Sequence, residues 1–318
     1  GSGSATARPG AAPATHGDPG AIDPRPLTEP LIDYLLRVEK LLIVGLPGAG
    51  KTQTLRALWG QLLERAQSDP DLPVPFLVNF STFSAYPGPL RDWLAEALLE
   101  CAGIQVALGR ALLQRGQIYL LLDGLDEMAA GRRPVVLTEL NEMFREADPA
   151  LARCVVCSRT LEYEQSAITL LLSAALELQP LSAAQVRVAV SQAGSATAPL
   201  AAALARDTSL AELLSTPLLL TIAARACAGR RDLAISGLGP VAVRRVIYDA
   251  YVVQMLLRST TPSTPLTPIL RWLHWLARYL SRNQSSLFLS ERLQPTALRA
   301  QQRYKRIVGL VVGLVLPL

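Results

Sequence analysis

The sequence is poor in the residues that build metal centres and disulfide frameworks. It contains two histidines, His16 and His274, and four cysteines in 318 residues. Two histidines cannot by themselves form a metal site, so we propose none of that kind. Four scattered cysteines are too few for a disulfide framework, which favours a reducing, cytoplasmic location. Cys154 and Cys157 form a CxxC pair in a β-like run without a second pair, and we expect them to be small core residues.

Long apolar runs and clustered charge are also scarce. No apolar segment near the N-terminus marks a signal peptide, and there is no internal repeat. The formal net charge is +5, but the basic residues are spread out except near the C-terminus, which predicts no nucleic-acid partner. Residues 307–318 are uniformly apolar but fall short of the roughly 20 residues that span a membrane. Basic residues precede this run, so we expect membrane contact there; the alternative is a buried element of a truncated domain.

What the sequence does contain is a glycine-rich loop between a strand-like run and a helical one. Residues 41–52 read LLIVGLPGAGKT and match GxxxxGK[ST], the P-loop pattern. Glycines let successive backbone N–H groups point at phosphate oxygens, and the following helix adds its positive N-terminus. We expect Lys51 to reach the β- and γ-phosphates and the Thr52 hydroxyl to bind Mg²⁺. The expected nucleotide contacts in this stretch are Gly45, Leu46, Pro47, Gly48, Ala49, Gly50, Lys51, Thr52 and Gln53.

A group of acidic residues follows a second apolar run. Residues 117–122, QIYLLL, are typical of a strand buried on both faces, and Asp123 comes directly after them. A carboxylate in that position is costly unless a cation meets it, and beside a P-loop the natural cation is Mg²⁺, so Asp123 fits the Walker B role. Asp126 and Glu127 lie just beyond, where one of them orients water against the γ-phosphate. The sequence leaves open which one does so, and the alternative is that one or both of them merely cap the helix beginning near Arg133.

Periodicity predicts an α/β fold followed by a purely helical region. Such a fold is right-handed and binds ligands at the carboxyl ends of its parallel strands. Arg159 would then emerge beside Gly45 and Asp123, where an arginine can stabilise γ-phosphate charge, although the residues alone favour an ordinary surface arginine. The expected strands are residues 41–44, 74–83, 117–122, 153–158 and 175–178. The expected helices include residues 27–38, 90–101, 134–146, 161–172, 182–192, 210–214, 217–228, 241–258 and 266–280.

Together these residues resemble the NACHT branch of the STAND signalling NTPases, relatives of the NOD-like receptors. The motifs that carry the resemblance are GLPGAGKT at Gly45, YLLLDGLDE at Tyr119, VVCSRT at Val155, LELQPLS at Leu176 and TPLLL at Thr216. The resemblance implies a P-loop NTPase sheet of order 5-1-4-3-2, a helical domain and the start of a winged-helix domain. It also implies that Arg159 is the sensor 1 residue and that Pro217 packs on the nucleotide base. The implied catalytic residues are Lys51, Asp126, Glu127 and Arg159.

The resemblance also implies an order of domains. We expect a flexible leader or tag at 1–26, a nucleotide-binding domain at 27–180, a helical domain at 181–259, a partial winged-helix-like region at 260–306 and a truncated apolar segment at 307–318. In family members a winged-helix histidine contacts the phosphate in the closed state. His274 lies in a different sequence context, so that contact is expected to be missing.

Family members switch between a closed ADP state and an open, oligomerising ATP state. We therefore expect a bacterial signalling or defence switch that binds ATP or ADP with Mg²⁺, hydrolyses ATP slowly and self-associates, its sensor and effector domains being absent from this chain. ATP is favoured over GTP, although scattered apolar residues of a base pocket do not decide the base. The alternative is a nucleotide-gated scaffold without turnover. A transporter ATPase is disfavoured because residues 84–116 lack an LSGGQ signature.

Overall fold

The computed structural model describes residues 27–83, 86, 88–128, 131–227, 238–259 and 266–282. The chain forms two compact units, Gly1–Ser259 and Thr260–Leu318. In the second unit the described residues form one helix, α13 (Leu266–Arg282), which carries His274. The expected leader and the expected apolar segment at 307–318 lie outside the described residues. Within the described ranges, no helix combines the length and the apolar character needed to cross a membrane.

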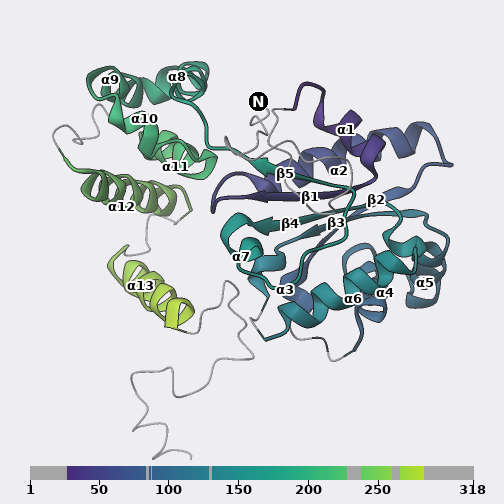
Figure 1. Ribbon diagram of the computed structural model, residues 1–318. Coiled ribbons are helices and arrows are strands. Elements are labelled where there is room, and N and C mark those ends of the chain that lie inside the picture. Colours follow the sequence, from purple (N-terminus) through teal and green to yellow (C-terminus); the bar gives the residue numbers. More distant parts are fainter. Residues whose placement is uncertain are drawn as a thin grey trace, which may run out of the picture. The chain divides into compact units, whose positions relative to one another are not determined.

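A five-stranded parallel sheet forms the centre of the first unit (Figure 1). Its strands are β1 (Lys40–Gly45), β2 (Val74–Asn79), β3 (Ile118–Asp123), β4 (Cys154–Arg159) and β5 (Ala174–Leu178). They run in the order β2-β3-β4-β1-β5, which confirms the sheet order that the resemblance implied. In the registers, Gly45 lies opposite Arg159 and Asn79 opposite Asp123. The carboxyl ends of these strands therefore bring polar side chains to one edge of the sheet.

Successive strand residues point to opposite sides of the sheet, and on both sides they are apolar. Helices therefore cover both faces. One face packs on α1 (Leu31–Val38) and α2 (Lys51–Ser68) and buries Leu41 and Ile43 of β1. The other face buries Leu42 and Val44 of the same strand. Figure 1 shows its helices on the opposite side of the sheet from α1 and α2. They are α3 (Phe80–Phe83), α4 (Leu90–Ala102), α5 (Val106–Gln114), α6 (Arg133–Arg145) and α7 (Thr160–Glu164).

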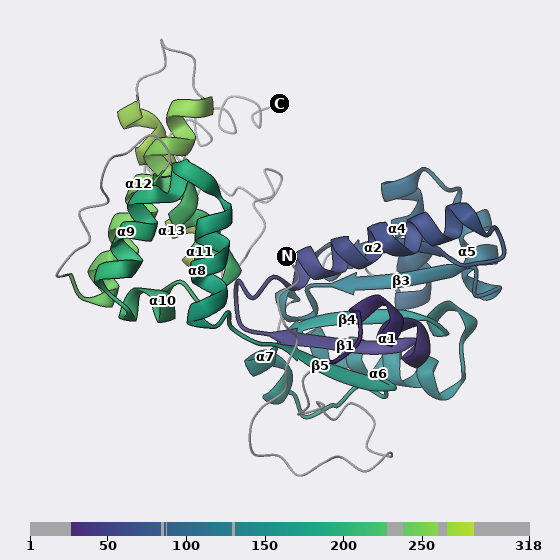
Figure 2. The ribbon, with the colours of Figure 1, turned by 90° about the horizontal axis from the view of Figure 1, so that it is seen from above.

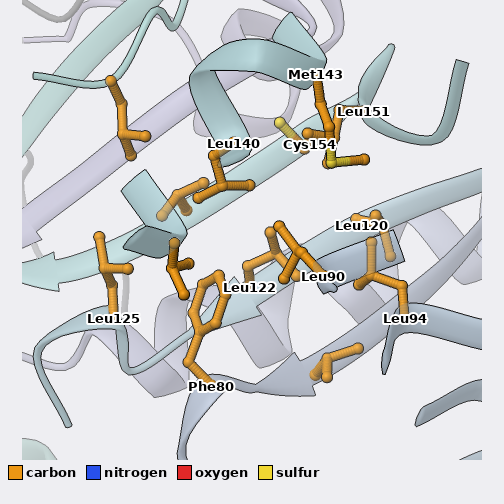
Figure 3. Close-up of a cluster of buried hydrophobic side chains, with 14 of the residues drawn as sticks. Phe80, Leu90, Leu94, Leu120, Leu122, Leu125, Leu140, Met143, Leu151 and Cys154 are labelled. Carbon is orange, nitrogen blue, oxygen red and sulfur yellow. The ribbon is translucent and has the colours of Figure 1, made fainter. Parts of the chain in front are cut away.

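The second of these faces holds the larger core. Figure 3 shows part of it, where Leu120 and Leu122 of β3 lie among Phe80, Leu90 and Leu140. Such close-packed aliphatic and aromatic side chains fix the strand ends that carry the polar edge.

The CxxC cysteines lie inside this sheet as the sequence predicted. Cys154 and Cys157 are both fully buried, and they belong to the cores on opposite faces of β4. Burial raises the pKa of the Cys154 thiol to about 12 and that of the Cys157 thiol well above its usual value. Thiols of this kind are inert packing groups rather than metal ligands or redox centres.

After β5 the chain becomes helical, which confirms the predicted change of pattern. The helices are α8 (Ala183–Gln192), α9 (Ala198–Arg206), α10 (Ser209–Leu213), α11 (Pro217–Cys227) and α12 (Pro240–Ser259). A capping box between Ser182 and Gln185 begins α8. These helices share a core of their own, centred on residues such as Leu200, Ala223 and Ile247, and Figure 2 shows them as a group.

Two local predictions were wrong. The expected strand at residues 74–83 ends at Asn79, because the Asn79 side-chain oxygen accepts a hydrogen bond from the Ser81 N–H at 2.7 Å and the chain turns into α3. The apolar pattern continues through Phe80 and Phe83, which bury their rings against Trp93 at ring-centroid distances of 5.7 and 5.1 Å. The apolar pattern extends beyond the strand because Phe80 and Phe83 are buried in α3, and this made the predicted strand too long.

The expected helix at residues 161–172 was the second error. Helix α7 ends at Glu164, and the following backbone is held by side chains instead of by helical bonds. The Leu170 N–H donates to the Tyr163 hydroxyl at 2.9 Å, and the Leu171 N–H donates to Asn141 Oδ1 at 2.8 Å. Asn141 comes from α6, a contact that local periodicity does not record. The sequence also missed two short helices, α5 and α9.

Candidate functional site

The loop of residues 46–50 joins β1 to α2 and has the geometry of an anion cradle. Gly48 and Gly50 adopt φ angles of +78° and +98°, a region that glycine enters without strain. Gly50 directly precedes α2, which is 18 residues long, has no acidic residue in its first turn and makes no side-chain cap hydrogen bond. Its first N–H groups and the positive end of its dipole are therefore available to a phosphate.

Lys51 begins α2 and folds back onto the loop. Its Nζ donates to the carbonyl oxygens of Gly45 at 2.7 Å and Leu46 at 3.2 Å. Partial burial lowers the pKa of Lys51, while the nearby Asp126 carboxylate opposes that change. The ammonium group is thus held at the loop by weak carbonyl partners that a phosphate can replace, since charge-assisted bonds to an anion are stronger.

Thr52 and Asp123 bring two oxygen ligands together. The Thr52 hydroxyl donates to Asp123 Oδ2 at 2.7 Å. Asp123 is 7% exposed at the end of β3, whereas Thr52 is exposed, so the pair has one buried and one open side. Hard oxygen donors next to solvent suit Mg²⁺, which keeps several of its waters when it binds protein. These two residues therefore fit a magnesium site.

Asp126 lies in η1 (Leu125–Glu127) and uses both of its oxygens on Arg159. Oδ1 accepts a hydrogen bond from the Arg159 backbone N–H at 3.0 Å, and Oδ2 pairs with the Arg159 Nε at 2.8 Å. The Asp126 side chain is 5% exposed. Arg159 also contacts Glu162, through Nη1 and Oε1 at 3.3 Å. Both carboxylate oxygens of Asp126 are therefore bound to Arg159, which the sequence pattern did not indicate.

Glu127, by contrast, reaches solvent. Partial desolvation raises the pKa of Glu127, and repulsion by Asp126 and Asp123 adds to the rise, against the opposing effects of Arg159 and a hydrogen bond from Asn79. Gly124, at φ +73°, makes room for this contact, because a Cβ there would lie 3.3 Å from the Glu127 carboxyl carbon. A carboxylate with a raised pKa at a solvent-facing edge can accept a proton from water.

Two residues of this site were missed by sequence reasoning. Asn79 ends β2 opposite Asp123, and its position at the carboxyl end of a strand was a usable signal. Arg133 donates from Nη2 to the Asp126 carbonyl oxygen at 2.7 Å and so fixes η1 from α6. Nothing local to Arg133 indicates that contact.

The N-terminus of α11 lies against the loop. The Leu218 N–H donates to the Gly48 carbonyl oxygen at 3.2 Å. A Cβ built on Gly50 would lie 3.8 Å from Pro217 Cγ, which is ordinary contact distance. Pro217 is therefore next to the loop, and its contact with a nucleotide base, which the resemblance implied, stays a prediction.

Comparison with known families agrees with this geometry. The model of the NACHT domain matches residues 39–197, which is half of the chain and includes the loop, the acidic residues and Arg159. The chain belongs to the NACHT domain family. No curated protein matches it significantly.

Solved structures resemble this NACHT protein at a general level. The Orc1 protein of Aeropyrum pernix, solved in complex with DNA, is 22% identical with a TM-score of 0.41, over 70% of this chain and 64% of that one. Drosophila ORC bound to DNA is 17% identical with a TM-score of 0.43, over 88% and 72% of the two chains. A Walker-type ATPase of Pyrococcus abyssi is 13% identical with a TM-score of 0.42, over 79% and 74%. The chain thus spans slightly less than two thirds of the length of the Aeropyrum protein.

Most residues singled out from the sequence of this NACHT protein meet at the carboxyl edge of its sheet. Lys51, Thr52, Asp123, Asp126 and Arg159 are linked there by the contacts given above. Leu46, Pro47 and Gln53 are exposed on the loop and the first turn of α2, and Ala49 packs against the core below the loop. Their contacts with a nucleotide stay predictions. His274 is exposed on α13 in the other unit.

Proposed function

We propose that this NACHT protein binds ATP and ADP with Mg²⁺ and hydrolyses ATP slowly, as a switch that controls self-association. The observation that supports this most is the meeting of a phosphate-type loop, a Thr52–Asp123 oxygen pair and an exposed acid with a raised pKa at one sheet edge. Each group matches one requirement of phosphoryl transfer, which depends on positioning and charge stabilisation.

The loop would bind the β- and γ-phosphates. Lys51 Nζ would exchange its bonds to the carbonyls of Gly45 and Leu46 for phosphate oxygens. The N–H groups of residues 48–52 would supply the remaining donors at the N-terminus of α2. Because the lysine is already held at the loop, little reorganisation is needed on binding.

Thr52 and Asp123 would hold Mg²⁺. The ion would supply neutralisation of charge on the β- and γ-phosphate oxygens. On the protein's side, Asp123 is fixed by its place in a strand buried on both faces, which keeps its carboxylate at the sheet edge.

Glu127 would orient the attacking water. Asp126 and Glu127 were equal candidates in the sequence, but both oxygens of Asp126 bind Arg159, whereas Glu127 faces solvent. The raised pKa of Glu127 also makes it a better proton acceptor than an ordinary surface carboxylate.

Turnover should be slow because the cationic charge near the γ-phosphate is already shared. Arg159 contacts Asp126 and Glu162 through Nε and Nη1, so only one of its guanidinium nitrogens is left to stabilise charge on the γ-phosphate. Self-association would bring a further cation from a neighbouring copy. A role in bacterial signalling or defence rests on the family alone. Preference for ATP over GTP is likewise part of this proposal, as is a cytoplasmic location.

The pairing of Arg159 with Asp126 and Glu162 favours a second candidate function, a scaffold that binds nucleotide and assembles without turnover. If that single open nitrogen does not stabilise the transition state enough, the γ-phosphate is recognised but not cleaved. The two candidates differ in phosphate release and agree in nucleotide binding.

The test is titration calorimetry with ATP and ADP in magnesium buffer, mass spectrometry of copurified nucleotide, and phosphate release. We expect binding that Lys51→Ala abolishes and Lys40→Ala, a lysine at the other end of β1, preserves. We expect slow release that Glu127→Gln suppresses and Glu100→Gln, an exposed acid on α4, does not. Binding without release supports the scaffold. No affinity for any purine diphosphate or triphosphate refutes both.

A further inference from the structure

We propose that Asp126 is a positioning residue for Arg159, which it holds by both main chain and side chain so that one guanidinium nitrogen stays open for an anion. This inference rests on the proposed function, because the anion it concerns is the γ-phosphate. It assigns to Asp126 a task different from that of the adjacent Glu127.

The contact between Asp126 and Arg159 is built at two levels. The Arg159 N–H, bound by Asp126 Oδ1 at 3.0 Å, belongs to the last residue of β4, so this bond fixes the strand end itself. The Arg159 Nε, bound by Oδ2 at 2.8 Å, fixes the direction of the guanidinium. One carboxylate thereby determines both where the arginine leaves the sheet and how its fork is turned.

Glu162 completes the arrangement from α7. Its Oε1 meets Arg159 Nη1 at 3.3 Å, and its side chain is 29% exposed against 5% for Asp126. Among the described residues, Arg159 Nη2 has no hydrogen-bond partner, and the arginine side chain is 40% exposed. Because guanidinium donors lie in one rigid plane, fixing Nε and Nη1 also fixes the direction in which Nη2 can donate.

The same geometry argues against Asp126 as the base. A water that used Asp126 as its acceptor would have to displace either the strand-end N–H or the arginine from a carboxylate that is nearly inaccessible. Charge-assisted bonds of 2.8 to 3.0 Å are the strong ones at this site, so such displacement is unfavourable. Asp126 is therefore expected to act on the nucleotide through Arg159.

A double-mutant cycle tests this in the full chain. Asp126→Asn keeps the size of the side chain and an oxygen for the Arg159 N–H but removes the charge that holds Nε. We expect Asp126→Asn and Arg159→Ala each to lower the affinity for ATP and the rate of phosphate release at least tenfold. We expect the double variant to be within threefold of Arg159→Ala alone, because the first substitution acts through the second residue.

Two further measurements separate positioning from general structural support. The affinity for ADP, which has no γ-phosphate, should change less than threefold in Asp126→Asn. A residue needed only for folding would weaken ADP and ATP binding equally. Glu162→Gln should give a smaller loss than Asp126→Asn, since its contact is longer and more exposed. The matched control is the surface pair of Arg153 and Glu39 at 3.4 Å, whose Arg153→Ala and Glu39→Gln variants should leave ATP affinity unchanged.

The inference is overturned if the two single effects multiply in the double variant, or if Asp126→Asn weakens ADP and ATP binding alike. If the protein does not hydrolyse ATP, the inference is tested by the ratio of ATP affinity to ADP affinity, measured in the wild type, the two single variants and the double variant. Failure of the proposed function has a different signature: the wild-type chain itself would bind neither nucleotide.

Discussion

Replacing Gly48 with alanine should weaken both the loop and its contact with α11. Gly48 has φ +78°, and a Cβ built there would lie 2.9 Å from Leu218 Cβ and 3.2 Å from Leu218 Cδ2. Rotating the leucine relieves the second contact but not the first, because Cβ is fixed by the backbone of α11. Moving α11 away would lengthen the bond of 3.2 Å from the Leu218 N–H to the Gly48 carbonyl oxygen.

The magnitude follows from these two costs. An L-residue in the left-handed region costs roughly 1–2 kcal/mol, and overpacking of a fixed contact costs about 1–3 kcal/mol. Gly48→Ala should therefore lower the free energy of unfolding by about 2–5 kcal/mol. Gly50→Ala is the matched control, because its φ is +98° and its Cβ would meet nothing closer than Pro217 Cγ at 3.8 Å. The free energy of unfolding of Gly50→Ala should fall only by the cost of the left-handed backbone, about 1–2 kcal/mol.

Urea unfolding followed by circular dichroism measures both variants, and calorimetry with ADP measures the site. One charge-assisted hydrogen bond lost from the displaced loop is worth about 1.5–3 kcal/mol, so ADP affinity should fall at least about tenfold in Gly48→Ala. Gly48→Ala should lower the free energy of unfolding less in a Leu218→Gly background than in the wild type, because the close contact with Leu218 Cβ is then absent. The reasoning is refuted if Gly48→Ala and Gly50→Ala lose equal stability, since the close approach of Leu218 would then constrain nothing.

Three further predictions concern the polar edge. Because the folded-state pKa of Glu127 is raised, its ionised form destabilises the nucleotide-free protein above that pKa. Glu127→Gln should therefore raise the free energy of unfolding at pH 8 and leave it nearly unchanged below about pH 4, and urea titrations showing the opposite trend would contradict this. Glu177, 7% exposed, accepts from the Thr160 hydroxyl at 2.9 Å, so Glu177→Ala should cost about 1–3 kcal/mol of unfolding free energy and Glu177→Gln less. Thr52→Val should remove the magnesium dependence of ATP affinity while Thr52→Ser preserves it; equal magnesium titrations for the two would reject the assigned ligand.

The sheet and the loop were largely predictable because their signals are local. A GxxxxGKT loop needs glycine at the positions with positive φ and Lys-Thr at the head of a helix, and all of these are adjacent in the chain. Strands buried on both faces must be apolar throughout, which is how β3 was found, and β1 and β4 carry short runs of the same kind. Their order came from the family resemblance, since no local pattern specifies which strands pair.

The predictions failed where a distant side chain replaces local bonding. At Leu171 the backbone N–H binds Asn141 of α6, so a segment with helical periodicity does not form a helix. At Asn79 a side-chain turn ends β2 while burial of Phe80 and Phe83 keeps the apolar pattern going. In both cases tertiary contacts, absent from a window of neighbouring residues, overrode propensity.

The sequence by itself determined that a polyphosphate loop, a metal-binding carboxylate and extra acids occur in one chain, because each is a short pattern with its own chemistry. Only the tertiary structure decided how the acids divide their work. Asp126 and Glu127 are neighbours of the same chemical type, and they differ because β4 brings Arg159 to one of them and leaves the other facing solvent. Hydrogen bonds depend on distance and direction in space, and separation along the chain gives neither.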